Sequence, residues 1–134
     1  MHGLLDLYAE AFAEPDTYRG ARPDDAYLRD LLAAPTFIAL VAEHAGDVVG
    51  GLCAYVLPKF EAARSEVYIY DLAVAERWRR QGIATGLIEA LKPIAAGRSA
   101  WVIFVQADRQ DDPAVALYET LGVREESLHY DIPV

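Results

Sequence analysis

The sequence predicts an α/β fold in which helices cover both faces of one sheet. Three observations support this fold class. Three β-prone runs follow one another between residues 37 and 74, as in a meander. Residues 82–96 then carry apolar side chains at helical spacing. Residues 100–107 form a near-continuously apolar run, which is typical of a strand inside a sheet that is covered on both faces.

Two helices are predicted before the first strand. The first has a stripe of apolar residues and ends at Pro15; the stripe consists of Leu4, Leu5, Tyr8, Ala9 and Phe12. The second is capped by Asp24 or Asp25 and stops before Pro35. Its apolar residues are Tyr27, Leu28, Leu31 and Leu32.

The first two strands are predicted at residues 37–43 and 48–57, joined by a hairpin turn at residues 44–47. The third strand covers residues 65–74, and Gly97 ends the helix that follows it.

Beyond the strand at residues 100–107 we expect one more helix and one more strand. Asp111 or Asp112 caps the last helix, Pro113 suits its first turn, and Gly122 terminates it. The inner face of this helix consists of Ala114, Leu117, Tyr118 and Leu121. Residues 128–132 have the pattern of a final strand.

Composition restricts the class of protein. A chain of 134 residues with 54% hydrophobic content can build one core, so we expect one domain over residues 1–134. It carries no run of the roughly 18 apolar residues that a membrane span needs and no signal-peptide pattern, so we expect a soluble cytoplasmic protein. Cys53 lies in an apolar strand pattern and is predicted to be a buried structural thiol, and the scattered histidines indicate no metal site.

The net charge is −9, from 21 acidic and 12 basic residues, which argues against nucleic acid as a partner. An acidic surface field attracts polycations instead. Three of the basic residues, Arg77, Arg79 and Arg80, lie together just before the predicted helix at residues 82–96.

This basic turn is a predicted phosphate site. The first amide N–H groups of a helix have no carbonyl partner, the helix dipole adds partial positive charge, and Gly82 allows a ligand to approach the backbone closely. The Walker pattern and the G-x-G-x-x-G pattern are both absent. The residues of the predicted site are Arg79, Arg80, Gln81, Gly82, Ile83, Ala84 and Thr85.

The motif Arg79-x-x-Gly82-x-Ala84 resembles the segment with which the GNAT superfamily of acetyltransferases holds the pyrophosphate of acetyl-CoA. Residues 72–74 before it and residues 111–123 after it match the superfamily's fourth strand and last helix. The resemblance implies a mixed, mostly antiparallel sheet with a central, splayed pair of parallel strands. It also implies a first strand that this sequence lacks, so we expect dimer contacts or an altered sheet border there.

The same resemblance implies residue roles. Leu72, Ala73 and Val74 would pair with the pantetheine arm of acetyl-CoA, and Tyr118 would protonate the leaving thiolate. The amine needs a base, for which Asp108 at the end of the strand is favoured, with Glu66 and Asp71 as competitors. No metal is implied.

Over residues 27–132 the chain is similar to the aminoglycoside 3-N-acetyltransferases of type I, most specifically at residues 55–61 and 68–74. This implies transfer of acetyl to the 3-amino group of drugs such as gentamicin, and hence antibiotic resistance. The negative charge suits such a cationic amino sugar. Beside Asp108, the implied substrate-binding residues are Glu61, Glu66, Tyr70, Asp71, Asp112, Glu125 and Glu126.

Two alternatives stay open. One is a GNAT acetyltransferase for a polyamine or a protein amine. The other is a module that binds acyl-CoA without catalysis. Turnover of a panel of amines distinguishes all three.

Overall fold

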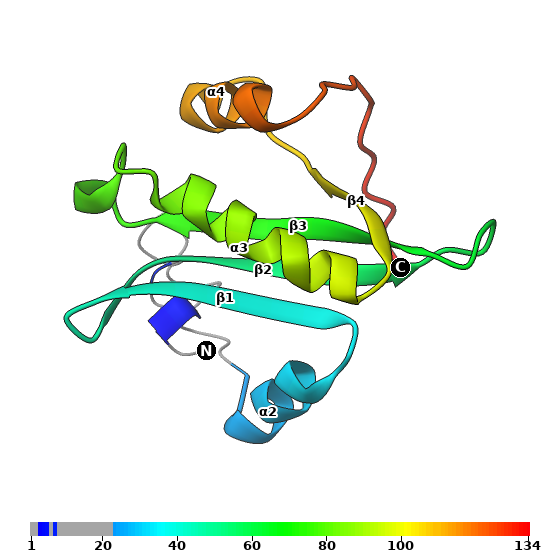
Figure 1. Ribbon diagram of the computed structural model, residues 1–134, viewed down its shortest axis with the longest axis horizontal. Helices are drawn as coiled ribbons and strands as arrows, with labels where there is room; N and C mark the ends of the chain where they lie inside the picture. The colour runs from blue at the N-terminus through cyan, green and yellow to red at the C-terminus, as the bar shows by residue number, and fades with distance from the viewer. Residues whose placement is uncertain (1–2, 6, 8–22) are drawn as a thin grey trace.

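A computed structural model describes residues 3–5, 7 and 23–134 of the chain (Figure 1). Residues 3–5 and 7 are helical, as predicted for the first helix. The remaining residues of that prediction lie outside the described residues: Tyr8, Ala9, Phe12 and Pro15. The elements that follow are α2 (Asp25–Ala33), β1 (Phe37–His44), β2 (Asp47–Pro58), β3 (Ser65–Val74), the 3₁₀ turn η2 (Glu76–Trp78), α3 (Ile83–Gly97), β4 (Ala100–Val105) and α4 (Asp112–Leu121).

The described strands form one sheet in the order β1-β2-β3-β4, in which β1, β2 and β3 are antiparallel and β3 and β4 are parallel. The predicted hairpin between β1 and β2 is confirmed. Its central residues, Ala45 and Gly46, have φ angles of 50° and 86°, and two positive φ angles are what a type I′ turn requires.

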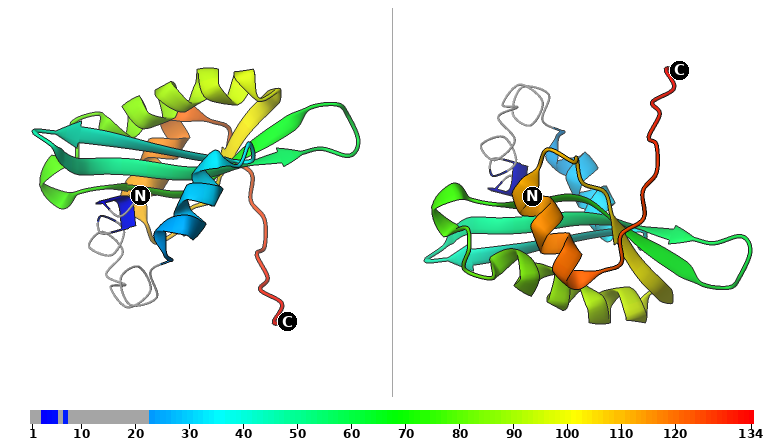
Figure 2. Two further views of the ribbon diagram at one scale, coloured as in Figure 1. Left: turned by 90° about the horizontal axis from the view of Figure 1, so that it is seen from below. Right: turned by 90° about the horizontal axis from the view of Figure 1, so that it is seen from above.

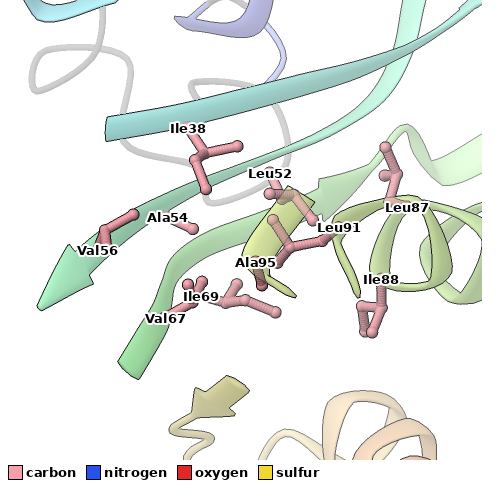
Figure 3. Packing of buried hydrophobic residues seen from close by; sticks show 10 residues of the cluster. All are labelled: Ile38, Leu52, Ala54, Val56, Val67, Ile69, Leu87, Ile88, Leu91 and Ala95. Carbon is pink, nitrogen blue, oxygen red and sulfur yellow. The ribbon is translucent and has the colours of Figure 1, made fainter. Parts of the chain in front are cut away.

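Helices cover both faces of the sheet, as predicted (Figure 2). Leu87, Ile88 and Leu91 of α3 pack on one face against buried residues of β1, β2 and β3 (Figure 3). On the opposite face, Leu4 and Leu7 of the N-terminal helix pack with a second buried group: Phe37, Cys53 and Ala73. Cys53 is a buried free thiol, which confirms its predicted place.

The predicted helix caps are also observed. The Asp24 carboxylate accepts a hydrogen bond from the Tyr27 amide at 2.8 Å, and the Asp111 carboxylate accepts one from the Ala114 amide at 3.3 Å. These bonds satisfy donors that the first turn of a helix leaves without a carbonyl partner. α3 has no side-chain cap. Every helix among the described residues is too short or too polar to cross a bilayer.

Two predictions at the C-terminal end are wrong. The first is the interior strand predicted at residues 100–107. The observed strand β4 ends at Val105, lies at the edge of the described sheet and has no fully buried residue. Residues 128–132 form no strand; they belong to a tail that runs away from the body of the protein (Figure 2). The two errors have one cause. An apolar run becomes an interior strand only when a neighbour pairs with its second edge, and the tail does not pair with β4.

The core under α3 gives a test of this packing. Leu91 is 0% exposed, so we expect Leu91→Ala to lower the free energy of unfolding by about 2–5 kcal/mol through lost burial and an internal cavity. Chemical denaturation measures this loss. The exposed neighbour Lys92, whose ion pair with Glu89 lies at the surface, provides the control, because Lys92→Ala removes only a weak surface contact. Equal effects of the two substitutions would contradict the packing.

Candidate functional site

The parallel strands β3 and β4 separate before β3 ends. Their pairing runs from Ser65 with Ala100 to Ile69 with Val105, where β4 stops. Residues 70–74 continue alongside β2 and have no partner in β4. A strand edge without a neighbouring strand can pair with an extended ligand through main-chain hydrogen bonds. Leu72, Ala73 and Val74, predicted to bind the donor, lie on this separated part of β3.

The turn after β3 presents free amides. The Arg79 amide donates to the Glu76 carbonyl at 3.3 Å, and the first bond of α3 runs from the Gly86 amide to the Gly82 carbonyl at 2.9 Å. Between them, the amides of residues 80–85 donate no hydrogen bond to any described residue. Left-handed φ angles of 62° at Arg80 and 79° at Gly82 shape this turn. The N-terminal end of α3 therefore holds a group of donors suited to an anion.

The arginines near this turn divide into two roles. The Arg79 guanidinium donates from Nε to the Val74 carbonyl at 3.1 Å, so it braces the turn against the end of β3. Arg77 and Arg80 are exposed, and they supply positive charge beside the free amides. The Gln81 side chain lies 3.5 Å from the Arg77 carbonyl.

A β-bulge lies where the two parallel strands separate. Cys53 is opposite Asp71 and Ala54 is opposite Ile69, so Tyr70 is the extra residue of β3. Bulges redirect side chains. Ile69 before the bulge and Leu72 after it both pack towards α3, three residues apart instead of two. Because of the bulge, the side chains of Tyr70 and Asp71 do not follow the strict alternation between the two faces of the sheet.

The sheet face opposite α3 carries a row of aromatic rings, which we call the aromatic row: Phe37, Tyr55, Tyr70, Tyr68 and Phe104. Consecutive centroids in this order are 5.4, 5.9, 5.5 and 4.6 Å apart, and all pairs are edge-to-face except the stacked rings of Tyr68 and Phe104. Tyr55 is 38% exposed and Tyr70 is 63% exposed, so the middle of the row is open to a ligand.

Only Tyr70 of the aromatic row was a sequence-predicted site residue. The alternation of Tyr68 and Tyr70 indicates a shared strand face, but the rings of Tyr55 and Phe104 join them only through strand register. The register between β2 and β3 depends on the position of the bulge, and the sequence does not show where the bulge lies.

Asp71 lies beside the aromatic row. Burial raises the pKa of the Asp71 carboxyl above its usual value. Burial also raises the pKa values of Tyr55 and Tyr68, and the negative charge of Asp71 adds to both shifts. The separated part of β3 therefore places a half-buried carboxylate next to exposed aromatic rings.

The other predicted acids are dispersed. Glu61 and Glu66 lie 3.9 and 3.6 Å from the Lys59 ammonium, at the opposite end of β3 from Asp71. Glu126 lies 3.2 Å from the Arg109 guanidinium and 3.6 Å from that of Arg124. Three more of the predicted acids are exposed: Asp108, Asp112 and Glu125. The structure therefore does not bring the predicted acids together in a single pocket.

Tyr118 lies on α4, half-buried, and packs against the hydrophobic core under α3. Burial and the nearby Asp111 carboxylate raise the pKa of the Tyr118 phenol to about 12. The phenol is therefore protonated across the physiological pH range, which is the form that can donate a proton. Among the described residues, no cluster of three or more His, Cys, Asp or Glu could hold a metal ion.

Solved structures similar to this chain include two aminoglycoside acetyltransferases from uncultured soil metagenomic samples. One is 60% identical with a TM-score of 0.98, and the alignment covers 100% of this chain and 90% of that one. The other, in complex with sisomicin, is 29% identical with a TM-score of 0.80, covering 99% of this chain and 91% of that one.

Among proteins of known activity, an N-alpha-acetyltransferase of Sulfurisphaera tokodaii is 31% identical over 103 residues, which are 67% of this chain and 59% of that enzyme. The chain thus spans less than two thirds of that relative. The model of the acetyltransferase (GNAT) family matches residues 1–123. This match includes the separated strands, the turn with free amides and α4, and the chain belongs to the GNAT family of acetyltransferases.

Proposed function

We propose that the protein transfers the acetyl group of acetyl-CoA directly to the 3-amino group of an aminoglycoside such as gentamicin. The observation that carries this proposal is the set of free amides at residues 80–85, next to the part of β3 that has no β4 partner. Transfer in the cytoplasm would convert one ammonium group of the drug into a neutral amide, and would thereby give resistance.

The donor fits this region by its chemistry. The diphosphate of acetyl-CoA needs several hydrogen-bond donors and positive charge, which the amides of residues 80–85 and the exposed Arg77 and Arg80 provide. The pantetheine arm carries amides, and the edge of β3 at residues 72–74 can pair with them as a further strand would.

The acceptor fits the aromatic row. An aminoglycoside is a polycation, and ammonium groups bind over the faces of aromatic rings. Tyr55 and Tyr70 expose such rings, and Asp71 supplies a carboxylate beside them. The net charge of −9 draws a polycation to the protein. The similarity to two aminoglycoside acetyltransferases, one in complex with sisomicin, supports the same substrate class.

We assign the proton transfers to two residues. Asp71 accepts the proton of the acceptor amine, since its raised pKa makes it a stronger base than an ordinary carboxylate. Tyr118 protonates the leaving thiolate, because its phenol holds its proton near neutral pH. Asp108, which sequence position favours as the base, is exposed in the loop after β4, and there we assign it to binding of the cationic substrate.

A second candidate function is acetylation of a protein amine. It is favoured by the 31% identity to an N-alpha-acetyltransferase. The two candidates share the donor site and differ in the acceptor.

A thiol-release assay with acetyl-CoA separates these candidates. We expect rapid turnover with gentamicin and sisomicin and slow turnover with spermidine or a peptide bearing a free N-terminus. NMR of the product is expected to show acetyl on the 3-amino group. Faster turnover of the peptide would favour the second candidate, and acetyl-CoA binding without turnover of any amine would leave only a binding module.

Gly82 tests the donor site. Its φ angle of 79° is unfavourable for other residues, and a Cβ there would meet no protein atom. Gly82→Ala therefore strains the turn and obstructs a ligand bound against it, without a clash inside the protein. We expect the Kd for acetyl-CoA, measured by calorimetry, to rise by about tenfold, since the strain is of the order of 1–2 kcal/mol.

Gly46 supplies the matched control for this test. It has a φ angle of 86°, and a Cβ there also meets nothing, but it lies in the hairpin between β1 and β2. Gly46→Ala should lower stability and leave the Kd unchanged. Equal effects on affinity would remove the turn from the donor site.

The base is tested by comparing Asp71→Asn with Asp108→Asn. We expect kcat with gentamicin to fall by about 100-fold in the first variant, as is typical for loss of a general base, and by much less in the second. In the unaltered enzyme the rate should increase with pH through the raised pKa of Asp71, because only the carboxylate accepts a proton. This increase should vanish in Asp71→Asn. The reverse order of the two variants would restore Asp108 as the base.

Tyr118→Phe should lower kcat by about 100-fold with little change in the Kd for acetyl-CoA, because it removes the proton donor and keeps the ring in place. Single-turnover kinetics measure the chemical step directly. Since burial raises the pKa of Tyr118 to about 12, no loss of rate from its ionisation is expected below about pH 10. Unchanged turnover in the variant would assign Tyr118 to packing alone.

A further inference from the structure

The Tyr68 phenol and the Gln106 side chain meet where the two parallel strands separate. The phenol donates a hydrogen bond to the Oε1 atom of Gln106 at 2.9 Å. Tyr68 is opposite Phe104 in the register of β3 and β4, and Gln106 is the first residue after β4. The contact therefore lies beside the last paired residues, Ile69 and Val105, between the aromatic row and the strand edge proposed to bind the donor.

Both side chains are on the face of the sheet opposite α3. Val67 and Ile69 are buried in the core under α3, so Tyr68 between them faces the other way. Its ring is stacked on that of Phe104, with 4.6 Å between the centroids, and this stacking holds the phenol in place. Tyr68 is half-buried and Gln106 is exposed, so a ligand over the aromatic row reaches both side chains.

This hydrogen bond determines what each of the two groups can offer to a ligand. A phenol has one proton to donate, and Tyr68 donates it to Gln106, so its oxygen meets a ligand only as an acceptor. The Gln106 amide uses its oxygen on Tyr68, so its NH2 group is the part that faces a ligand as a donor. Neither side chain makes another hydrogen bond within the described part of the chain. One acceptor and one donor are therefore held side by side.

An amine with an oxygen atom on the neighbouring carbon fits this pair. The N–H of the amine donates to the phenol oxygen, and the neighbouring oxygen accepts from the amide NH2 group. Amino sugars carry such pairs of nitrogen and oxygen, whereas a polyamine such as spermidine carries its amines on a hydrocarbon chain. The acidic field and the aromatic rings attract both kinds of polycation, but the pair of Tyr68 and Gln106 matches only the first.

We propose that Tyr68 and Gln106 form a subsite that selects an amine next to an oxygen, as in an amino sugar. This inference rests on the proposed function, because it places the acceptor of the same acetyl transfer. Tyr68 binds an amino group of the substrate. Gln106 binds the neighbouring oxygen and keeps the phenol proton away from the amine. The subsite thus makes a choice among cationic amines that net charge alone does not make.

Steady-state kinetics with gentamicin as substrate and spermidine as competing amine test the subsite. Gln106→Leu removes the amide, and we expect the KM for gentamicin to rise by about tenfold with little change in kcat, as for the loss of a hydrogen bond that binds the substrate. The inhibition constant of spermidine should hardly change, because spermidine has no oxygen for the amide to bind. Tyr68→Phe removes the phenol oxygen, keeps the stacked ring and should weaken the binding of both amines.

Gln110→Leu is the matched control, because Gln110 is an exposed glutamine in the same loop after β4. It should leave the binding of both amines unchanged. The double variant Tyr68→Phe with Gln106→Leu should bind gentamicin better than the product of the two single effects predicts, since each residue acts partly through the other. The Kd for acetyl-CoA should stay unchanged in every variant, which separates a subsite from a general loss of structure.

The outcomes separate this inference from the proposed function. Absence of gentamicin turnover by the unaltered enzyme would overturn the proposed function, and the subsite with it. Turnover of gentamicin with the same KM in Gln106→Leu and Gln110→Leu, or with equal losses of gentamicin and spermidine binding in Gln106→Leu, would overturn the subsite alone. A Kd for acetyl-CoA that rises together with the KM would instead assign the two side chains to the packing of the strands.

Discussion

The amides of residues 80–85 at the start of α3, which donate no hydrogen bond within the described part of the chain, are the constraint on which the rest of the site depends. Leaving the first amides of a helix without partners costs free energy. A side-chain cap normally recovers part of this cost, as Asp24 does for α2 and Asp111 for α4. α3 has Gly82 in that position and no cap. The exposed turn keeps its donors available to water or to an anion, and the brace from Arg79 to β3 keeps the turn in place.

The bulge at Tyr70 connects the two halves of the proposed site. On one edge of β3 it coincides with the end of the pairing to β4, which frees the strand for the donor. On the face opposite α3 it places Tyr70 and Asp71 beside Tyr55 and Tyr68. The bulge therefore places two features on the same segment of β3: a strand edge that can bind the donor, and a carboxylate that lies beside aromatic rings.

Features set by local chemistry were predictable from the sequence. The hairpin at Ala45 and Gly46, the caps of α2 and α4, and the basic turn before α3 each depend on a few adjacent residues. The aromatic row and the edge position of β4 depend on strand register and on pairing between distant segments, which one sequence does not reveal. The tail shows the difference well, because its alternating pattern indicates a strand and its partner is not specified by that pattern.

The most direct measurement follows the backbone amide NMR signals of residues 80–85 during titration with acetyl-CoA. If these amides hold the diphosphate, their proton shifts should move downfield together and saturate with one equivalent of acetyl-CoA, whereas the amides of the hairpin at residues 45–46 stay unchanged. Saturable binding that leaves the signals of residues 80–85 unmoved would contradict the account.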